Sequence, residues 1–141
     1  MIPRERYAGA IDAFNRDDPA GFAAIYAEDA IVHDPLYPQP LRGRAAVEQD
    51  AADLRRAIPD ARFTLLDVLQ DQSAIAFRYG LIGTHLGPLS TPDGEIAPTG
   101  STIDVPGAVF SRLDRDGFVE EERRYFDVSR LLAQVGLVNV A

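Results

Sequence analysis

Apolar residues near the start of the chain recur every three or four positions, as they do along one face of an amphipathic helix. Tyr7, Ala10, Ile11 and Phe14 follow this spacing. We therefore predict a first helix over residues 3–16, with an aromatic stripe along it.

Two further helices are indicated by the residues at their ends. Asp18 followed by Pro19 is typical of a helix start, because aspartate accepts hydrogen bonds from free backbone N–H groups and proline fits the first turn. We expect this short second helix to end near Ala27. An alanine-rich, alternately charged stretch predicts a third helix over residues 44–57, which Pro59 terminates.

Beyond Pro59 the apolar positions alternate, which is the period of a half-buried strand. We predict four strands by this alternation, at residues 62–69, 73–82, 102–113 and 118–127. Residues 83–100 are rich in glycine and proline, and we expect a long irregular loop there. This loop is either a lid that excludes water from the site or a disordered segment. Residues 31–43 contain three prolines and should run from an extended piece into a constrained loop, and residues 129–135 should form a terminal helical turn.

Helices followed by meandering strands indicate an α+β fold. We expect the N-terminal helices to pack on one face of a strongly curved antiparallel sheet. A length of 141 residues fits one domain, and we find neither an internal repeat nor a composition change that would divide it. The whole chain, residues 1–141, is therefore predicted to form a single domain.

Composition excludes several kinds of chemistry. The 22 acidic and 14 basic residues give a net charge of −8, so nucleic acid and anionic membranes are poor partners. The chain has no cysteine, and all its basic residues are arginines, which excludes a thiolate nucleophile and a lysine Schiff base. No apolar stretch is long enough for a membrane span or a secretion signal, so we expect a cytoplasmic protein.

Candidate catalytic groups must be dispersed, since the chain contains none of the short catalytic motifs. Asp127 lies between apolar neighbours, where an apolar cavity would raise the pKa of its carboxyl group and make it a useful base. The alternative is a cap for the helical turn that follows. His85 has the parity of the apolar residues in its strand, so it is either a catalytic group or a structural, hydrogen-bonded histidine.

His33 and Asp34 follow an apolar pair and should lie at the rim of a cavity. Adjacent strand residues face opposite sides, so they need not act together. Metal binding by these two residues and His85 is a weak alternative, because their spacing matches no metal signature. Residues 120–124, Glu-Glu-Glu-Arg-Arg, are typical of a solvated face, although Arg123 and Tyr125 share parity with Asp127.

Several local strings, in their order along the chain, resemble the SnoaL-like polyketide and ester cyclases of the NTF2-like superfamily. The resemblance covers nearly the whole chain and rests on Phe22-Ala23-Ala24-Ile25-Tyr26-Ala27-Glu28-Asp29-Ala30, Val32-His33-Asp34-Pro35, Leu41-Arg42-Gly43-Arg44-Ala45-Ala46-Val47, Ile58-Pro59-Asp60, Gly83-Thr84-His85-Leu86-Gly87, Pro98-Thr99-Gly100 and Tyr125-Phe126-Asp127. It implies a cone-shaped α+β barrel around an apolar pocket, no cofactor or metal, and a homodimer or larger homo-oligomer.

The same resemblance implies an enzyme in which Asp127 removes a proton alpha to the carbonyl of an apolar, polyketide-like substrate, so that an aldol closure can follow. Arg123 stands where the family commonly has tryptophan, and the strand before it lacks the histidine that some cyclases use. His85 or His33 would then donate to the enolate oxygen. We expect the substrate to contact five residues: Phe14, Tyr37, Tyr79, Arg123 and Tyr125.

Two other functions remain open at this stage. An epoxide hydrolase would use Asp127 and a second carboxylate such as Asp104 to activate water, with Arg123 or Arg78 to orient them. A small-molecule binding module would need no catalytic group at all. The orientation of Asp127 separates these possibilities, because a carboxylate that points away from the cavity and caps the terminal helix favours binding over catalysis.

Overall fold

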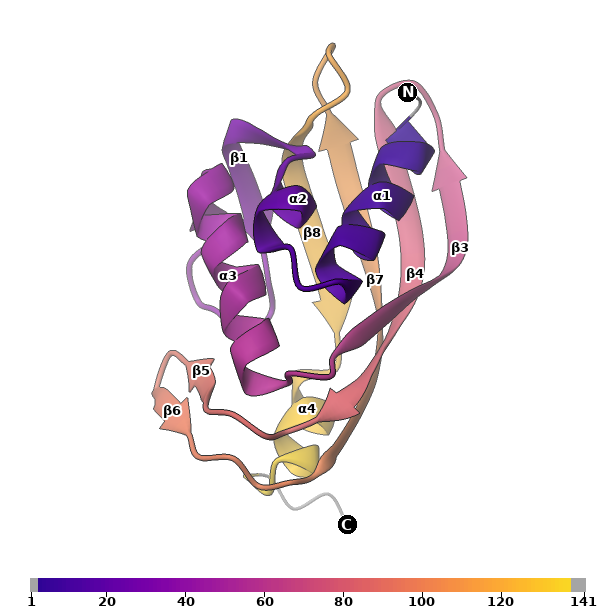
Figure 1. Ribbon diagram of the computed structural model, residues 1–141. Helices are drawn as coiled ribbons and strands as arrows, with labels where there is room; N and C mark the ends of the chain where they lie inside the picture. The colour runs from indigo at the N-terminus through magenta and orange to yellow at the C-terminus, as the bar shows by residue number, and fades with distance from the viewer. Residues whose placement is uncertain (1–2, 138–141) are drawn as a thin grey trace.

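Three helices cover one face of a curved six-stranded sheet in the computed structural model, which describes residues 3–137 (Figure 1). The helices are α1 (Pro3–Asn15), α2 (Pro19–Ala23), α3 (Arg44–Ala57) and α4 (Val128–Gln134). The strands are β1 (Tyr26–His33), β2 (Leu41–Arg42), β3 (Arg62–Gln70), β4 (Ala74–Thr84), β5 (Leu89–Thr91), β6 (Gly94–Ile96), β7 (Thr102–Leu113) and β8 (Val119–Phe126). The predicted α+β class is confirmed.

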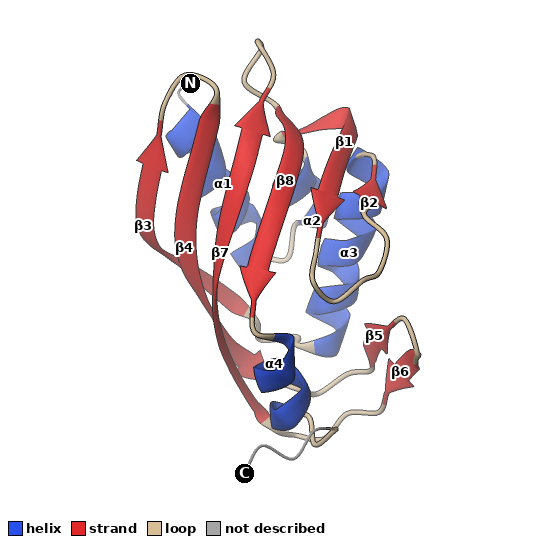
Figure 2. Cartoon of the chain, turned by 180° about the vertical axis from the view of Figure 1, so that it is seen from behind, coloured by secondary structure: helices blue, strands red, loops and turns tan. Residues whose placement is uncertain are grey.

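The large sheet has the strand order β2-β1-β8-β7-β4-β3, which Figure 2 shows from the side opposite the helices. Its pairs are antiparallel except for β1 and β8, which run parallel. The sheet is therefore mixed, and the expectation of a wholly antiparallel sheet needs this one correction. The parallel pair arises because β1 joins the sheet beside the last strand of the chain instead of beside its neighbours in sequence.

The helices begin where their end signals indicate, but one ends early. Asp18 caps α2 by accepting a hydrogen bond from the backbone N–H of Gly21, as predicted. The helix ends at Ala23, however, and Tyr26 already belongs to β1. Tyr26 is fully buried against the sheet, so tertiary packing outweighs the helical spacing that predicted an end near Ala27.

The glycine- and proline-rich stretch is more regular than predicted. Strand β4 continues to Thr84, and the small hairpin of β5 and β6 forms within residues 83–100. Leu89 of this hairpin is buried in the core cluster. In Figure 1 the hairpin lies beside the end of α3. No helix of the described residues is long and apolar enough to cross a membrane.

The core lies between the helices and the concave face of the sheet. Alternate residues of β4 and β7 point into it, and the aromatic side chains of α1, α2, β3 and β4 pack edge to face there. The core is not completely filled, because a cavity remains among these rings.

Candidate active site

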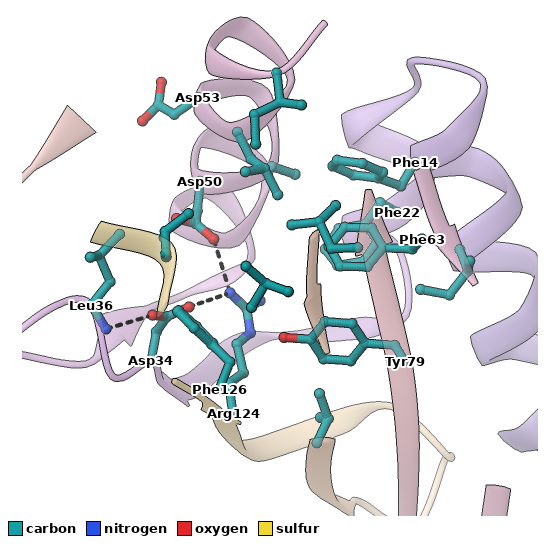
Figure 3. A pocket seen from close by; sticks show the side chains of 18 of the residues that line it. Phe14, Phe22, Asp34, Leu36, Asp50, Asp53, Phe63, Tyr79, Arg124 and Phe126 are labelled. Atoms are coloured by element: carbon teal, nitrogen blue, oxygen red, sulfur yellow. Dashed lines mark hydrogen bonds and ion pairs between the residues drawn. The ribbon is translucent and has the colours of Figure 1, made fainter. Parts of the chain in front are cut away.

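An apolar cavity of about 140 Å³ lies between the helices and the sheet. Its walls include the aromatic rings of Phe14, Phe22, Phe63, Phe77 and Phe126, together with aliphatic side chains from α1, α3, β4 and β7. Figure 3 shows three of these rings gathered at one end and a group of charged side chains at the other. A cavity with an apolar body and a few convergent polar groups is the usual form of a small-molecule site.

Arg124 occupies the polar end of the cavity and joins two carboxylates. Its Nη1 atom lies 3.2 Å from Asp34 Oδ2 and 2.9 Å from Asp50 Oδ2. The three side chains are largely buried, with 9% of Asp34, 18% of Asp50 and 13% of Arg124 exposed. Charge-assisted hydrogen bonds of this kind are strong where water is excluded.

The parallel strand pair explains why these distant residues meet. Within it His33 of β1 lies opposite Arg123 of β8, so Asp34, the next residue, comes beside Arg124. Asp50 reaches the same point from α3, which packs against β1. Asp34 and Arg124 are 90 residues apart in the chain, and only this fold brings them together.

The environment of Asp34 favours its protonated form more than water does. Burial raises the pKa of its carboxyl group above the ordinary value, and the nearby charge of Asp50 acts in the same direction. The Arg124 guanidinium and the backbone N–H of Leu36, which donates to Asp34 Oδ1 at 2.9 Å, oppose the rise without cancelling it. Asp34 is thus a carboxyl group beside an apolar cavity with a pKa moved towards the range of a general base.

A third carboxylate, behind the cavity, holds Arg124 in place. Glu122 is 2% exposed, and its Oε2 accepts a hydrogen bond from Arg124 Nε at 2.9 Å. Tyr26 donates to both Glu122 oxygens, at 3.0 and 2.8 Å, and Ser111 donates to Oε1 at 2.9 Å. Tyr7 bonds to Ser111 and lies 3.3 Å from Glu122 Oε1. Each group is satisfied, so the network fixes the guanidinium plane.

Two groups at the polar end offer hydrogen-bond donors. The carboxylates engage Arg124 through Nε and Nη1, which leaves Nη2 outside those ion pairs, and no residue in the described part of the chain forms a hydrogen bond with the Tyr79 hydroxyl. Figure 3 shows the Tyr79 hydroxyl pointing towards Arg124. Burial raises the pKa of Tyr79 to about 12, so the phenol stays protonated at neutral pH. Both groups can therefore donate to an oxygen atom of a ligand.

Gly107 on β7 makes room for the Tyr79 ring. A β-carbon at position 107 would collide with the ring and the hydroxyl oxygen of Tyr79. The two residues are direct partners in the β4–β7 register, so only glycine lets the ring lie across the neighbouring strand. The aim of the hydroxyl into the cavity depends on this missing side chain.

The sequence did not reveal Arg124 and Glu122, because residues 120–124 are typical of a solvated face and the inward parity was predicted from Asp127. A β-bulge also shifts the parity of β8, since Glu121 is two positions beyond Val119 where the partner strand advances by one, from Leu113 to Arg112. After the bulge Glu122, Arg124 and Phe126 face the core, whereas the stretch was predicted to be a solvated face. Asp50 had no signal of its own within a charged helix, and Asp34 was identified only as a residue of the cavity rim.

Asp127 does not lie in the cavity. It is exposed, and its Oδ1 accepts a hydrogen bond at 3.1 Å from the backbone N–H of Arg130 as the N-cap of α4. The prediction that an apolar cavity surrounds this carboxylate is wrong, because the residue follows the end of β8 and turns outwards to start the helix. The alternative, a helix cap, is what the structure has. For Asp127 itself this orientation favours a binding module over catalysis, so a catalytic role has to rest on another carboxyl group.

The two histidines occupy different places, and neither lines the apolar cavity. His85 is 1% exposed, and its Nδ1 accepts from the backbone N–H of Thr99 at 3.3 Å and lies 2.9 Å from the Thr99 hydroxyl. His33 is half-buried on the other side of β1, with Nε2 3.3 Å from Glu121 Oε2. His33 and His85 therefore do not form a metal site with Asp34. Among residues 3–137 no group of three or more histidine, cysteine, aspartate or glutamate side chains could hold a metal ion.

The predicted substrate-binding residues divide into two groups. Phe14, Tyr37 and Tyr79 line the apolar cavity, and Tyr37 donates to Asp50 Oδ1 at 3.0 Å. Arg123 and Tyr125 instead face outwards, where they line a second cavity together with His33. Contact of any of the five with a substrate stays a prediction.

The residues first considered for epoxide hydrolysis are also dispersed. Asp104 pairs with Arg130 at 3.9 Å beside α4, and Arg78 pairs with Asp67 at 2.6 Å on the outer face of the sheet. Neither lines the apolar cavity. The residues predicted for an epoxide hydrolase therefore do not form a site in this cavity. Asp34, Asp50 and Arg124 do provide two carboxylates and an arginine there.

Comparison with known proteins gives a family match over most of the chain. The model of the SnoaL-like domain matches residues 7–122. A curated relative, the steroid Delta-isomerase of Nocardioides simplex, is 34% identical over 68 residues, which are 48% of this chain and 55% of the isomerase. The match thus spans about half the length of each protein.

Solved structures share the fold over nearly the whole chain. IdmH of Streptomyces antibioticus, provisionally assigned as a polyketide cyclase, is 28% identical with a TM-score of 0.72 over 96% of this chain and 99% of IdmH. A SnoaL-like protein of Jannaschia sp. CCS1, also provisionally assigned as a polyketide cyclase, has a TM-score of 0.81 over 97% of this chain and 93% of its own, at 17% identity. At that identity the second likeness concerns the fold alone.

Proposed function

The chain belongs to the SnoaL-like family of the NTF2-like superfamily, and from this premise we propose that it is a cofactor-independent cyclase or isomerase of an apolar, polyketide-like carbonyl compound. Asp34 is the general base that removes a proton alpha to the carbonyl group. The observation that carries the proposal is one buried carboxyl group, of raised pKa, at the polar end of an otherwise apolar cavity. Asp34 takes the role that the sequence suggested for Asp127.

The geometry supports proton abstraction because the base and two oxyanion donors share one end of the cavity. An apolar substrate would fill the aromatic end and direct its carbonyl oxygen to Tyr79 and Arg124 Nη2. When Asp34 removes the alpha proton, negative charge develops on that oxygen, where preorganised donors stabilise it most. Aldol closure or return of the proton to another carbon would follow, depending on the substrate.

The proposal is tested by exchange of alpha protons in D2O, which needs a base but no knowledge of the natural substrate. Cyclohexanone serves as the probe, and 3-cyclohexen-1-one adds a direct assay of isomerisation. We expect Asp34→Asn to lower both rates by about 10² to 10⁴-fold, the usual contribution of a general base. Asp127→Asn is the matched control, since asparagine also caps helices well and the site lies outside the cavity.

Two outcomes would count against this assignment. Exchange that survives in Asp34→Asn and disappears in Asp127→Asn would restore the base suggested by the sequence. If the wild-type protein is no faster than Asp34→Asn in either reaction, over a panel of apolar ketones, the proposal of enolate chemistry is wrong.

A second function is favoured by the Asp34–Arg124–Asp50 arrangement itself. Asp34, with its raised pKa, can donate a proton to an epoxide oxygen, while Asp50, held by Arg124 and Tyr37, can take a proton from an attacking water molecule. Both carboxylates would then be essential, whereas proton abstraction needs only Asp34. Cyclohexene oxide in ¹⁸O-labelled water tests this, and formation of labelled diol that is lost in both Asp34→Asn and Asp50→Asn would support hydrolysis.

A further inference from the structure

A second cavity, of about 270 Å³, lies on the other side of the polar cluster. The loop between β1 and β2 forms one wall, with Pro35, Pro38 and Pro40, and the outer side of β8 forms the other, with Arg123. Three prolines restrict the backbone of this loop, so its shape is largely set before any ligand binds. The cavity opens to solvent, and its lining combines the prolines and two tyrosines with charged side chains, among them Asp34, Arg123 and Arg124.

Three residues line both cavities: Asp34, Tyr37 and Arg124. They are joined through hydrogen bonds, from Arg124 to Asp34 and Asp50 and from Tyr37 to Asp50. We call these three residues the polar partition, since each of them lines the apolar cavity and the open one. Asp34 therefore has one side towards a bound substrate and another towards water.

We infer that the second cavity is a solvent route to Asp34 that stays open when the apolar cavity is occupied. An apolar ligand would displace water from its own cavity, whereas the second cavity opens to solvent and keeps water around its charged groups, Asp34, Arg123 and Arg124. Water in the second cavity can then reach the Asp34 carboxyl group, because Asp34 also lines that cavity. The route itself follows from the geometry, and only its catalytic use rests on the proposed function.

The route has a defined use in catalysis. The alpha C–H bond of the substrate breaks, its electron pair enters the enolate, and the proton passes to an Asp34 carboxylate oxygen. The resulting carboxylic acid exchanges this proton for one from water in the second cavity while the enolate is still bound. Asp34 then delivers the solvent proton to an enolate carbon, which forms the new C–H bond and regenerates the carboxylate. Exchange with solvent therefore competes with direct return of the original proton.

The absence of cysteine from the chain allows a direct test of access. Asp34→Cys places a single thiol at the partition, and its reaction rate with aminoethyl methanethiosulfonate reports its exposure to water. Val109→Phe is designed to block the apolar cavity, because Val109 lines that cavity and not the second one. Gln39→Trp is designed to block the second cavity, because Gln39 lines that cavity and not the apolar one. Tyr37→Cys, at another residue of the partition, repeats the measurement if Asp34→Cys folds poorly.

We expect Gln39→Trp to slow modification of the thiol by about 10-fold or more and Val109→Phe to change it by less than about 3-fold, since access limits thiol reactivity. A reporter in the apolar cavity, Leu54→Cys, should show the opposite dependence. Equal protection of both reporters by Val109→Phe would overturn the inference, because Asp34 would then be reached only through the apolar cavity.

A kinetic measurement tests the catalytic use separately. In D2O, Gln39→Trp should lower alpha exchange of cyclohexanone by about 10-fold and leave isomerisation of 3-cyclohexen-1-one within about 2-fold, since internal proton return needs no solvent. Equal loss of both rates would refute a proton-exit role. If wild-type protein catalyses neither reaction, the proposed function fails, whereas the cysteine measurement still decides whether the route exists.

Discussion

Three carboxylates around one guanidinium determine what Asp34 can do. Glu122 accepts a hydrogen bond from Arg124 Nε, while Asp34 and Asp50 both lie on Nη1, whose two N–H groups can serve one carboxylate each. Burial nevertheless raises the pKa of the Asp34 carboxyl group, the charge of Asp50 adds to the rise, and Arg124 opposes it only in part. Glu122 matters to the site because its hydrogen bond with Nε fixes the guanidinium beside Asp34.

This charge balance predicts how stability depends on pH. A carboxyl group whose pKa is raised by folding binds its proton more tightly in the folded state, so it stabilises the protein at low pH. That contribution is lost as the pH rises through the raised pKa. Asp34→Asn should therefore raise the melting temperature at pH 7, while the difference from wild type shrinks below pH 4. Thermal unfolding of both proteins from pH 4 to pH 7 tests this prediction. A melting-temperature difference between Asp34→Asn and wild type that becomes less favourable to the variant as the pH rises would contradict it.

Tyr79 should contribute to rate and not to stability. Its hydroxyl bonds to no described residue, so Tyr79→Phe removes no internal hydrogen bond, and the ring remains packed against Phe63. Loss of one oxyanion donor lowers kcat by about 10² to 10³-fold in known cases. We expect a drop of that order in isomerisation of 3-cyclohexen-1-one. Tyr125→Phe, on the exposed outer face, is the matched control, and equal rates for the two variants would exclude Tyr79 as a donor.

At the scale of elements, Asp127 acts as the N-cap of α4. Removal of an aspartate N-cap costs about 0.5–2 kcal/mol, so Asp127→Ala should lower the free energy of unfolding by that amount. Asp127→Asn should lower it by much less, because asparagine can accept the same hydrogen bond. Urea denaturation measures both variants. Isomerase activity at saturating probe should match wild type in each, and a selective loss of activity without loss of stability would return Asp127 to the catalytic site.

Most elements could be predicted from the sequence because their signals are local. Helices α1 and α3 and strands β3, β4, β7 and β8 follow from apolar spacing and end residues within about two positions. Two features could not. Tyr26 fits a helical stripe and lies in a strand, and the bulge before Glu122 leaves no mark in a run of three glutamates. A bulge moves every later side chain to the opposite face, so the apolar residues before it do not indicate which charges after it face the core. The prediction instead took its parity from Asp127, which lies beyond the end of β8 and turns outwards.

At the scale of the whole molecule, the site depends on one pairing that the sequence does not announce. The end of β1 meets the end of β8 in parallel, and this contact alone brings Asp34 to Arg124. The resemblance to a known family predicted the fold and an apolar pocket, yet the residue it favoured, Asp127, lies outside the cavity, whereas Asp34, the residue after β1, lines it. Family-level patterns describe where a pocket lies, whereas the charged groups that reach it depend on register.

The apolar cavity also has a consequence for stability as a whole. An unfilled cavity forfeits contacts that a larger side chain could make, and filling one commonly stabilises a protein by about 0.5–2 kcal/mol. Val109→Phe should therefore raise the melting temperature and abolish exchange of cyclohexanone, since the ring would occupy the ligand space. Ile75→Phe, at a buried position of β4 that lines neither of the two cavities described above, should instead destabilise through overpacking by about 1–3 kcal/mol.

Calorimetry and the exchange assay on the two variants separate a true cavity from ordinary core. A melting temperature that falls in both variants would mean that the space around Val109 is already filled in solution. Stabilisation by Val109→Phe with exchange unchanged would place the reaction outside the apolar cavity. Gain of stability together with loss of exchange is the result expected of a fold that leaves part of its core empty for a substrate.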